Sequence, residues 1–241
     1  MRFFALIPAF NDGDTVAEIA AETARQCPVI VVDDGSSDRT PEALASVPVT
    51  VLRNPRNQGK AWSLHRGFQE ALRRGADAVV TLDADGQHPV AELPRLLDAA
   101  REEPGSVIMA ARVLDREQIP PLRLFAHRNA NFWISWAAGY PILDTQSGFR
   151  VYPATLLRQL DLPCDPHRSF VFESEALIRA AKLGYSVRSV PIRAIYRADA
   201  RPSHYRPAVD TLRIIRMVAG HLVRSGLNPA GLLRSLSQQP R

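Results

Sequence analysis

The sequence predicts an α/β fold, a single domain in which helices flank a mostly parallel sheet. Short β-rich runs alternate with longer helical patterns over residues 3–111. Repeated strand–helix–strand order gives right-handed crossovers and parallel strand pairs. Residues 29–32 are all apolar, which is typical of a parallel strand covered on both faces. A chain of 241 residues is long enough to enclose a buried core.

The N-terminal half supplies most of the expected sheet. We expect strands at residues 3–7, 29–32, 49–53, 78–82 and 107–111. The helices between them are expected at residues 15–26, from Pro41 onward, at 60–74 and at 93–101. Asp14 is a suitable N-cap for the first of these helices, and Gly75 is a suitable end for the third. The fixed φ of Pro41 fits a first helical turn.

Beyond residue 111 the pattern favours longer helices. We expect helices at 122–138, 173–182 and 207–224, with a turn at 145–149. A late strand at 187–195 is expected to be short or at an edge, because Pro191 cannot donate to a strand ladder.

The last expected helix is amphipathic. We place five apolar residues on one face, namely Val209, Leu212, Ile215, Val218 and Leu222. We expect Val209, Leu212 and Ile215 to pack on the body or on a second subunit. The arginines of the same helix are expected to face outward, toward phosphate or an anionic membrane surface.

Composition excludes several classes of protein. Apolar residues make up 46% and charged residues 23% of the chain, which argues against a disordered or fibrous protein. Polar residues interrupt the longest apolar stretch, 122–140, so we expect no membrane span. Cys27 and Cys164 are too few for a disulfide framework or a thiolate zinc cluster. Together with the absence of a signal-peptide pattern, they predict a cytoplasmic protein.

Positive charge is concentrated near the C-terminus. Residues 186–241 contain ten Arg and two acidic residues, a net charge of +8, while the remaining 185 residues carry −3. A basic segment on a mildly acidic body predicts contact with a phosphate, a lipid headgroup or nucleic acid. Nucleic acid is the weakest of these because no aromatic stacking motif accompanies the arginines.

Acidic residues follow several of the expected strands. In an open parallel sheet, ligands bind beyond the carboxyl ends of the strands. The residues expected at this edge are Pro8, Phe10 and Asp12 after the first strand, Asp33 and Asp34 after the second, Asp83 to His88 after the fourth, and Arg112 after the fifth. Three acidic clusters and one arginine are therefore expected to converge.

The pair Asp83 and Asp85 predicts a cation site. Two carboxylates one residue apart repel each other unless a cation lies between them. Oxygen ligands of this kind suit Mg²⁺ or Mn²⁺, ions that commonly hold a diphosphate as well. The Gln87 carboxamide and the His88 imidazole are expected to serve as further ligands or to orient the site. The alternative interpretation is that Asp-Gly here only forms a turn.

Two further residues suit a nucleotide. Lys60 follows Asn57-Gln58-Gly59 at an expected helix start, where backbone N–H groups and an ammonium favour an anion. An Asp34 carboxylate can accept the imide N–H of uracil or the amide edge of guanine. Each has an ordinary alternative, a solvated lysine and a capping turn.

The ordered segments 7–12, 31–40, 57–60 and 83–89 together resemble the inverting family 2 glycosyltransferases. Within that family the likeness is to dolichol-phosphate mannosyltransferases and bacterial polyprenyl-phosphate transferases. Segments 144–150, 172–175 and 190–192, followed by Arg197, resemble later landmarks of the same branch. The resemblance runs from residue 3 to residue 203.

The resemblance implies a GT-A type, Rossmann-like fold and a site for a UDP-sugar or GDP-sugar donor. Residues matching those around the base and ribose are Pro8, Phe10, Asp12 and Asp34. Residues matching the metal and diphosphate site are Asp83, Asp85 and Gln87, with Ala84 against the nucleotide. Arg112 and Arg197 match arginines that face phosphates. The implied organisation is a nucleotide-binding half at 1–115, an acceptor half at 116–206, and a basic amphipathic helix and tail at 207–241.

The implied acceptor is a polyprenyl phosphate or another lipid-linked group, reached from the inner face of a membrane by peripheral contact. A phosphate acceptor is already anionic and needs no base, whereas a hydroxyl acceptor needs a carboxylate. The candidates for that base are Asp144, Glu173 and Glu175. Relatives often carry Gly-x-Ser-Lys after the last arginine, where this chain has Arg201-Pro202-Ser203-His204. This departure puts the acceptor-phosphate contact in question.

Other functions remain open on the sequence alone. A catalytically silent glycosyltransferase relative that acts as a binding scaffold would keep the same fold. A sugar-nucleotide-forming nucleotidyltransferase would need a Gly-rich loop after the first strand, and residues 8–12 do not form one. A receiver-like signalling domain is about half this length and leaves Asp83, Asp85 and Gln87 without a role.

Overall fold

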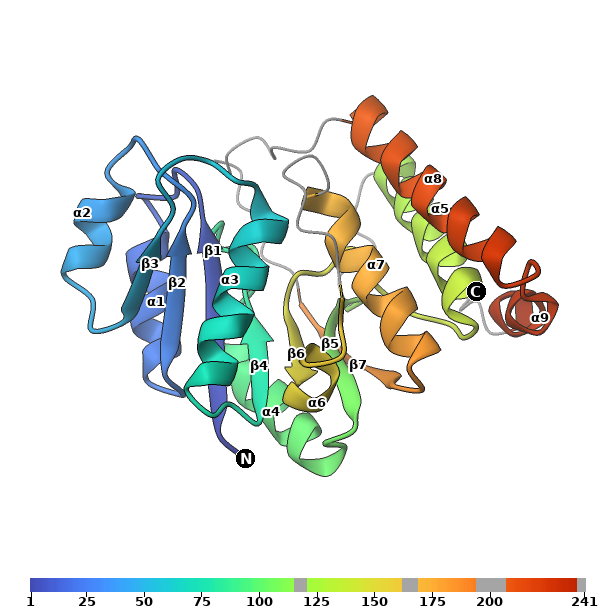
Figure 1. Ribbon diagram of the computed structural model, residues 1–241, viewed down its shortest axis with the longest axis horizontal. Helices are drawn as coiled ribbons and strands as arrows, with labels where there is room; N and C mark the ends of the chain where they lie inside the picture. Colours follow the sequence, from blue (N-terminus) through green and yellow to red (C-terminus); the bar gives the residue numbers. More distant parts are fainter. Residues whose placement is uncertain (115–120, 162–168, 194–206, 238–241) are drawn as a thin grey trace.

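The computed structural model describes residues 1–114, 121–161, 169–193 and 207–237. Its centre is a seven-stranded sheet of order β3-β2-β1-β4-β6-β5-β7 (Figure 1). The strands are β1 (Phe3–Ala9), β2 (Val29–Asp33), β3 (Thr50–Arg53), β4 (Ala78–Thr81), β5 (Ser106–Arg112), β6 (Arg150–Pro153) and β7 (Ser186–Ile192). Strand β6 runs antiparallel to β4 and β5, while the other pairs are parallel. The predicted mostly parallel α/β sheet is confirmed.

Helices cover both faces of the sheet. The N-terminal helices are α1 (Val16–Ala24), α2 (Thr40–Ala45), α3 (Lys60–Arg73), the short 3₁₀ helix η1 (Val90–Glu92) and α4 (Leu93–Glu102). The later helices are α5 (Pro121–Ala138), α6 (Ala154–Leu157), α7 (Ser169–Lys182), α8 (Pro207–Arg224) and α9 (Pro229–Ser237). No helix within these described residues is both long and apolar enough to cross a bilayer.

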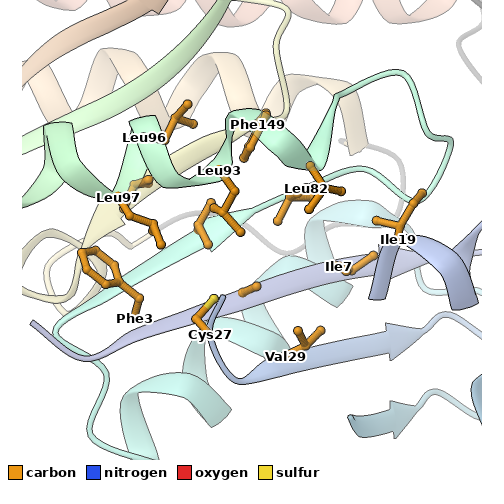
Figure 2. Close-up of a cluster of buried hydrophobic side chains, with 14 of the residues drawn as sticks. Phe3, Ile7, Ile19, Cys27, Val29, Leu82, Leu93, Leu96, Leu97 and Phe149 are labelled. Carbon is orange, nitrogen blue, oxygen red and sulfur yellow. The ribbon is translucent and has the colours of Figure 1, made fainter. Parts of the chain in front are cut away.

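Two apolar layers bury the faces of the sheet. On one face, α1 lies against β1 and β2, and α4 lies against β5, β6 and β7. The cluster beneath them contains Leu93 and Leu97 of α4, with Leu97 above Phe3 of β1 (Figure 2). On the other face, α3, α6 and α7 cover the sheet through a second cluster that contains Phe68. Apolar burial of this extent is the main favourable contribution to folding. Both layers leave the carboxyl ends of β1, β2 and β4 at one edge of the sheet.

A third apolar cluster joins α5, α7 and α8 beside this sandwich. Ile134, Ile178, Val218 and Leu222 are among its buried members. In Figure 1, α8 lies along α5 at the side of the molecule formed by the C-terminal helices. Helix α7 therefore contacts the sheet with one face and the C-terminal helices with another.

The structure corrects the expected packing of α8. Leu212 and Ile215 are 54% and 55% exposed, so the prediction that they pack on the body is wrong. The prediction failed because three-residue steps drift by about 60° per step on an α-helix, so Val209 and Val218 cannot share a face. Val218 and Leu222 are buried as expected, and the side chain of Val209 lies outside the description.

Other differences are small or local. The late strand lies at the sheet edge as predicted but ends at Ile192. Strand β6 follows the expected turn at 145–149, was not predicted from the sequence, and inserts between β4 and β5. Helix α7 begins at Ser169, earlier than expected. Cys27 is a free, buried thiol, whereas Cys164 lies outside the described residues.

Candidate functional site

Asp34 fixes the loop that leads into α3. Its Oδ1 accepts hydrogen bonds from Asn54 Nδ2 at 2.6 Å and from the Gln58 backbone N–H at 2.9 Å. Its Oδ2 accepts one from the Gly59 N–H at 2.8 Å. Because Gly59 has a φ of 87°, a conformation that favours glycine, the chain turns sharply there. The buried Asp34 carboxylate therefore sets where α3 begins and where Lys60 stands.

The loops after β1 and β2 are joined to each other. The Asn11 N–H donates to Ser36 Oγ at 2.9 Å, and Asn11 Oδ1 accepts from the Ser37 N–H at 2.8 Å. Asn11 has a φ of 57°, a left-handed conformation that Asn tolerates. Neighbouring Asp12 accepts the Phe10 N–H at 2.9 Å, and both residues are half-buried. Sequence reasoning included Phe10 and Asp12 but missed the joining role of Asn11.

The loop after β4 is hydrogen-bonded to the segment that follows β1. Thr15 Oγ1 donates to the Ala84 carbonyl at 2.5 Å, and Ala84 is buried. Pro8 lies within β1, half-buried, and its Cα pairs with that of Val32. Hydrogen bonds thus join the loops that follow β1, β2 and β4, which carry the residues predicted to surround a nucleotide.

Asp33 carries an unusual buried charge. Its Oδ1 accepts the Ser36 N–H at 2.9 Å. Its Oδ2 is buried without a hydrogen bond, and Arg53 Nε lies 3.4 Å away. An ion pair at this distance offsets part of the cost of burying a carboxylate.

Lys60 bridges two carboxylates from different halves of the chain. Its Nζ lies 2.5 Å from Asp83 Oδ1 and 3.1 Å from Glu173 Oε1 on α7. Burial alone would lower the pKa of Lys60, but the charges of Asp83 and Glu173 outweigh burial and raise it. Burial likewise opposes ionisation of Asp83, yet Lys60 and His88 hold its pKa well below the usual range. Lys60 and Asp83 are therefore both charged at neutral pH.

The Asp83 carboxylate is held from two further sides. His88 is buried, with Nε2 3.7 Å from Asp83 Oδ2 and its ring against Phe149. Gly148 lies directly beside the carboxylate, and a Cβ there would overlap with it. A side chain larger than hydrogen at residue 148 would displace Asp83.

Asp85 is exposed at the same edge, and its Oδ1 accepts the Gln87 N–H at 3.0 Å. Partial loss of water and the nearby Asp83 charge raise the pKa of Asp85. A cation placed here would relieve that repulsion.

This donor set fits a hard divalent ion bound together with a phosphate ligand. In the described part of the chain, no three His, Cys, Asp or Glu side chains come together as a ready metal cluster. Asp83 and Asp85 provide carboxylate oxygens, and the half-buried Gln87 can add a carboxamide oxygen. Mg²⁺ and Mn²⁺ are commonly bound by one or two carboxylates, with water and phosphate oxygens completing the shell.

Arg112 is paired with Asp144 at the end of β5. The guanidinium donates from Nε to Oδ2 at 2.7 Å and from Nη2 to Oδ1 at 3.0 Å. The Arg112 backbone N–H donates to Oδ2 as well, at 3.1 Å. Burial raises the pKa of Asp144, but Arg112 outweighs burial and holds it at about 2. A carboxylate of such low basicity is better suited to orienting Arg112 than to accepting a proton.

Glu173 and Glu175 point in different directions. Two residues on an α-helix are about 200° apart, so they cannot share a face. Glu173 lies at Lys60, whereas Glu175 is buried beside Arg179, 3.0 Å away, and His221 of α8, 3.5 Å away. Of the three candidate bases, the structure brings only Glu173 to Asp83.

Sequence reasoning missed the buried Arg150. Its Nε donates to the Ser147 carbonyl at 2.6 Å, and Nη1 donates to the Glu173 carbonyl at 2.6 Å. The guanidinium thus joins the turn that carries Gly148 to α7. The sequence signal for it was an arginine directly after the Ser-Gly-Phe turn, and the structure shows that this arginine is fully buried. Arg197 and His204 lie outside the described residues.

The Arg112–Asp144 pair gives a test of stability. We expect Asp144→Asn to lower the free energy of unfolding near neutral pH by about 2 kcal/mol, because Arg112 loses its counter-charge. The folded-state pKa of about 2 lies below the ordinary 3.8. The ionised pair therefore stabilises the wild type above about pH 4, and this contribution is lost as pH falls toward 2.

Urea unfolding at a series of pH values measures this effect. The difference between Asp144→Asn and the wild type should narrow steadily below about pH 4. Asp98→Asn, which removes an exposed partner of Arg101, is the matched control and should change stability by less than about 0.5 kcal/mol. A difference that stays constant down to about pH 2 contradicts the assigned pairing.

Comparison with known proteins places this geometry in a family. The family model described as "Glycosyl transferase family 2" matches residues 4–161. An undecaprenyl-phosphate mannosyltransferase of Micrococcus luteus is 30% identical over 82% of this chain and 85% of that protein. A polyprenol monophosphomannose synthase of Mycolicibacterium smegmatis is 32% identical over 79% of this chain and 76% of that protein.

A solved structure confirms the GT-A type fold. Glucosyl-3-phosphoglycerate synthase from Mycobacterium tuberculosis, crystallised with Mn²⁺, UDP and phosphoglyceric acid, superposes with a TM-score of 0.65 at 21% identity. The match covers 94% of this chain and 79% of that one. With the strand order, the acidic edge and the family match in agreement, the chain belongs to glycosyl transferase family 2.

Proposed function

We propose that the protein is an inverting, metal-dependent transferase that moves a sugar from a nucleoside diphosphate to a polyprenyl phosphate. The observation that carries this proposal is the meeting of Asp83, Asp85, Lys60 and Glu173 at one sheet edge. Residues 1–115 would form the nucleotide half and 116–206 the acceptor half. The two curated relatives support the acceptor class, since their names specify polyprenyl carriers.

On the donor side, the loops after β1 and β2 would hold the nucleoside. The fixed positions of Phe10, Asp12 and Asn11 favour a preformed pocket edge over one that orders on binding. The joined Asp34 loop presents the α3 N-terminus, whose N–H groups favour phosphate. We assign the base as uracil or guanine, and the UDP bound by the structural neighbour supports the first of these.

Asp83, Asp85 and Gln87 would hold a divalent ion at the diphosphate. Bound there, such an ion stabilises the negative charge that develops on the leaving nucleotide. Arg112, oriented by Asp144, adds a second fixed positive charge. Preorganised charges of this kind are usually the largest contribution to catalysis of such a step. We assign Arg197 to the same group of phosphate contacts on the strength of the sequence motif.

On the acceptor side, a phosphate monoester attacks without a base because it is already anionic. Glu173 would then position Lys60 and not accept a proton. If the acceptor is a hydroxyl, Glu173 is the carboxylate in place to take its proton. The relatives favour the phosphate, and the hydroxyl acceptor is the second candidate.

A transfer assay tests this function. Labelled UDP- and GDP-sugars are incubated with polyprenyl phosphate or with the matching polyprenol, with Mg²⁺ or Mn²⁺ present. We expect transfer to the phosphate with inversion, and a loss of about 100-fold or more in Asp85→Asn. Asp98→Asn, which changes an exposed acidic residue of α4, is the control and should keep wild-type activity.

The outcomes separate the candidates. Transfer only to the polyprenol would move the assignment to a hydroxyl acceptor and give Glu173 the role of base. Failure to transfer from any UDP- or GDP-sugar, with nucleotide still bound, would favour the silent scaffold.

A lipid-linked acceptor also requires contact with a membrane, and α8 and α9 offer a suitable surface. Their exposed apolar side chains are Leu212, Ile215, Val223, Leu233 and Leu236. Exposed Arg216, Arg224 and Arg234 accompany them. We propose that this surface, the α8–α9 surface, meets the anionic inner face of a bilayer. A second copy of the chain fits less well, because it would set arginines against arginines.

Vesicle sedimentation tests the α8–α9 surface. We expect anionic vesicles to retain the protein at low salt and to release it at high salt, and neutral vesicles to retain little. The double variant Leu212→Asp with Ile215→Asp should lose retention. Val51→Asp, at an exposed apolar residue of β3, should not. Equal recovery from neutral and anionic vesicles contradicts the proposal.

A further inference from the structure

The sheet edge at Asp83, where we propose that a divalent ion binds, already holds the positively charged side chain of Lys60. Lys60 Nζ makes ion pairs with Asp83 and with Glu173, at 2.5 Å and 3.1 Å. The side chains of Lys60, Asp83 and Glu173 are only 23%, 23% and 13% exposed. Partial shielding from water strengthens such pairs compared with surface ion pairs. The same Asp83 carboxylate is the one that the proposed function gives to a divalent ion.

The Lys60 side chain can change position while its backbone stays in place. The loop before it is held by three hydrogen bonds to Asp34, so the backbone at the start of α3 is fixed. The four-carbon stem of lysine is flexible and can carry the ammonium several ångströms without backbone movement. Replacement of the Lys60 ammonium by a divalent ion at Asp83 therefore requires only a change in the Lys60 rotamer, without a change in the fold.

We propose that Lys60 is an internal counter-ion, which occupies the cation position at Asp83 in the free protein and gives it up when the donor binds. The proposal rests on the proposed function. A divalent ion on Asp83 would repel the adjacent ammonium, so the ion binds weakly on its own. A diphosphate offers the ammonium a new anionic partner. Binding of the nucleotide must then raise the affinity for the metal, and binding of the metal must raise the affinity for the nucleotide by the same factor.

Because Lys60 contacts both Asp83 and Glu173, donor binding at Asp83 also affects Glu173, which lies in the proposed acceptor half. When Lys60 turns to the diphosphate, the Glu173 carboxylate loses its ion pair with Lys60. Arg150 still holds the Glu173 backbone in place through the carbonyl. Lys60 is thus a positioning residue, because the binding of the donor decides whether Glu173 is paired with Lys60.

Titration of the protein with Mn²⁺ alone tests the inference. The paramagnetic resonance signal of free Mn²⁺ reports binding directly, with no need for turnover. We expect Lys60→Met to bind Mn²⁺ about tenfold more tightly than the wild type, because the competing ammonium is gone. Addition of UDP or GDP should tighten Mn²⁺ binding strongly in the wild type and much less in Lys60→Met.

Two further variants serve as controls. Lys182, the only other lysine of the chain, lies beside His221, and Lys182→Met makes the same change of charge away from the site. It should keep wild-type Mn²⁺ affinity. Lys60→Arg keeps a cation in place and should also bind Mn²⁺ weakly, which separates the effect of charge from any effect on folding.

The outcomes are distinct. If Lys60→Met binds Mn²⁺ no more tightly than the wild type, or if Lys182→Met tightens binding equally, the counter-ion role is overturned while the donor site stands. If the wild type binds no Mn²⁺ even with UDP or GDP present, both the counter-ion role and the proposed function are overturned.

Discussion

The structure depends on how negative charge is compensated at one edge of the sheet. Asp33, Asp34 and Asp83 lie at that edge, at the carboxyl ends of parallel strands. Each carboxylate needs a hydrogen-bond or ion-pair partner because it is shielded from water. Backbone N–H groups and an amide satisfy Asp34, and Lys60 satisfies Asp83. Asp85, beside Asp83, has a raised pKa. The edge is therefore built to accept additional positive charge.

Helix α7 connects this edge to the rest of the molecule. One face of the helix carries Glu173 to Lys60, and another carries Glu175 to Arg179 and His221 of α8. Arg150 anchors the same helix to the turn beside Asp83. The sheet edge at Asp83, the turn at 145–149 and the C-terminal helices are thus linked through a single helix.

The positions of several candidate site residues could be predicted because the ends of the strands can be recognised in the sequence. The apolar run 29–32 and its neighbours located the strands, and the rule that ligands bind beyond their carboxyl ends located Asp34, Asp83 and Arg112. The partners of these residues could not be predicted. The pairing of Arg112 with Asp144 and of Lys60 with Glu173 depends on long-range packing that no local pattern encodes.

Strand β6 and the orientation of α8 also escaped prediction, for separate reasons. Strand β6 has only four residues, of which the first is Arg150 and the last is Pro153, so it is too short to show a strand pattern in the sequence. On α8, Leu212 and Ile215 are apolar yet exposed, and apolar periodicity alone cannot show which face is buried.

We propose that the edge at Asp83 and Asp85 binds a nucleoside diphosphate together with a divalent ion. Calorimetric titration with UDP and with GDP, each with and without Mn²⁺, tests this binding most directly when wild type and Asp85→Ala are compared. We expect metal-dependent binding of one nucleotide that is lost in Asp85→Ala. Binding that is equal in the two proteins, or that is absent from the wild type with metal present, would contradict it.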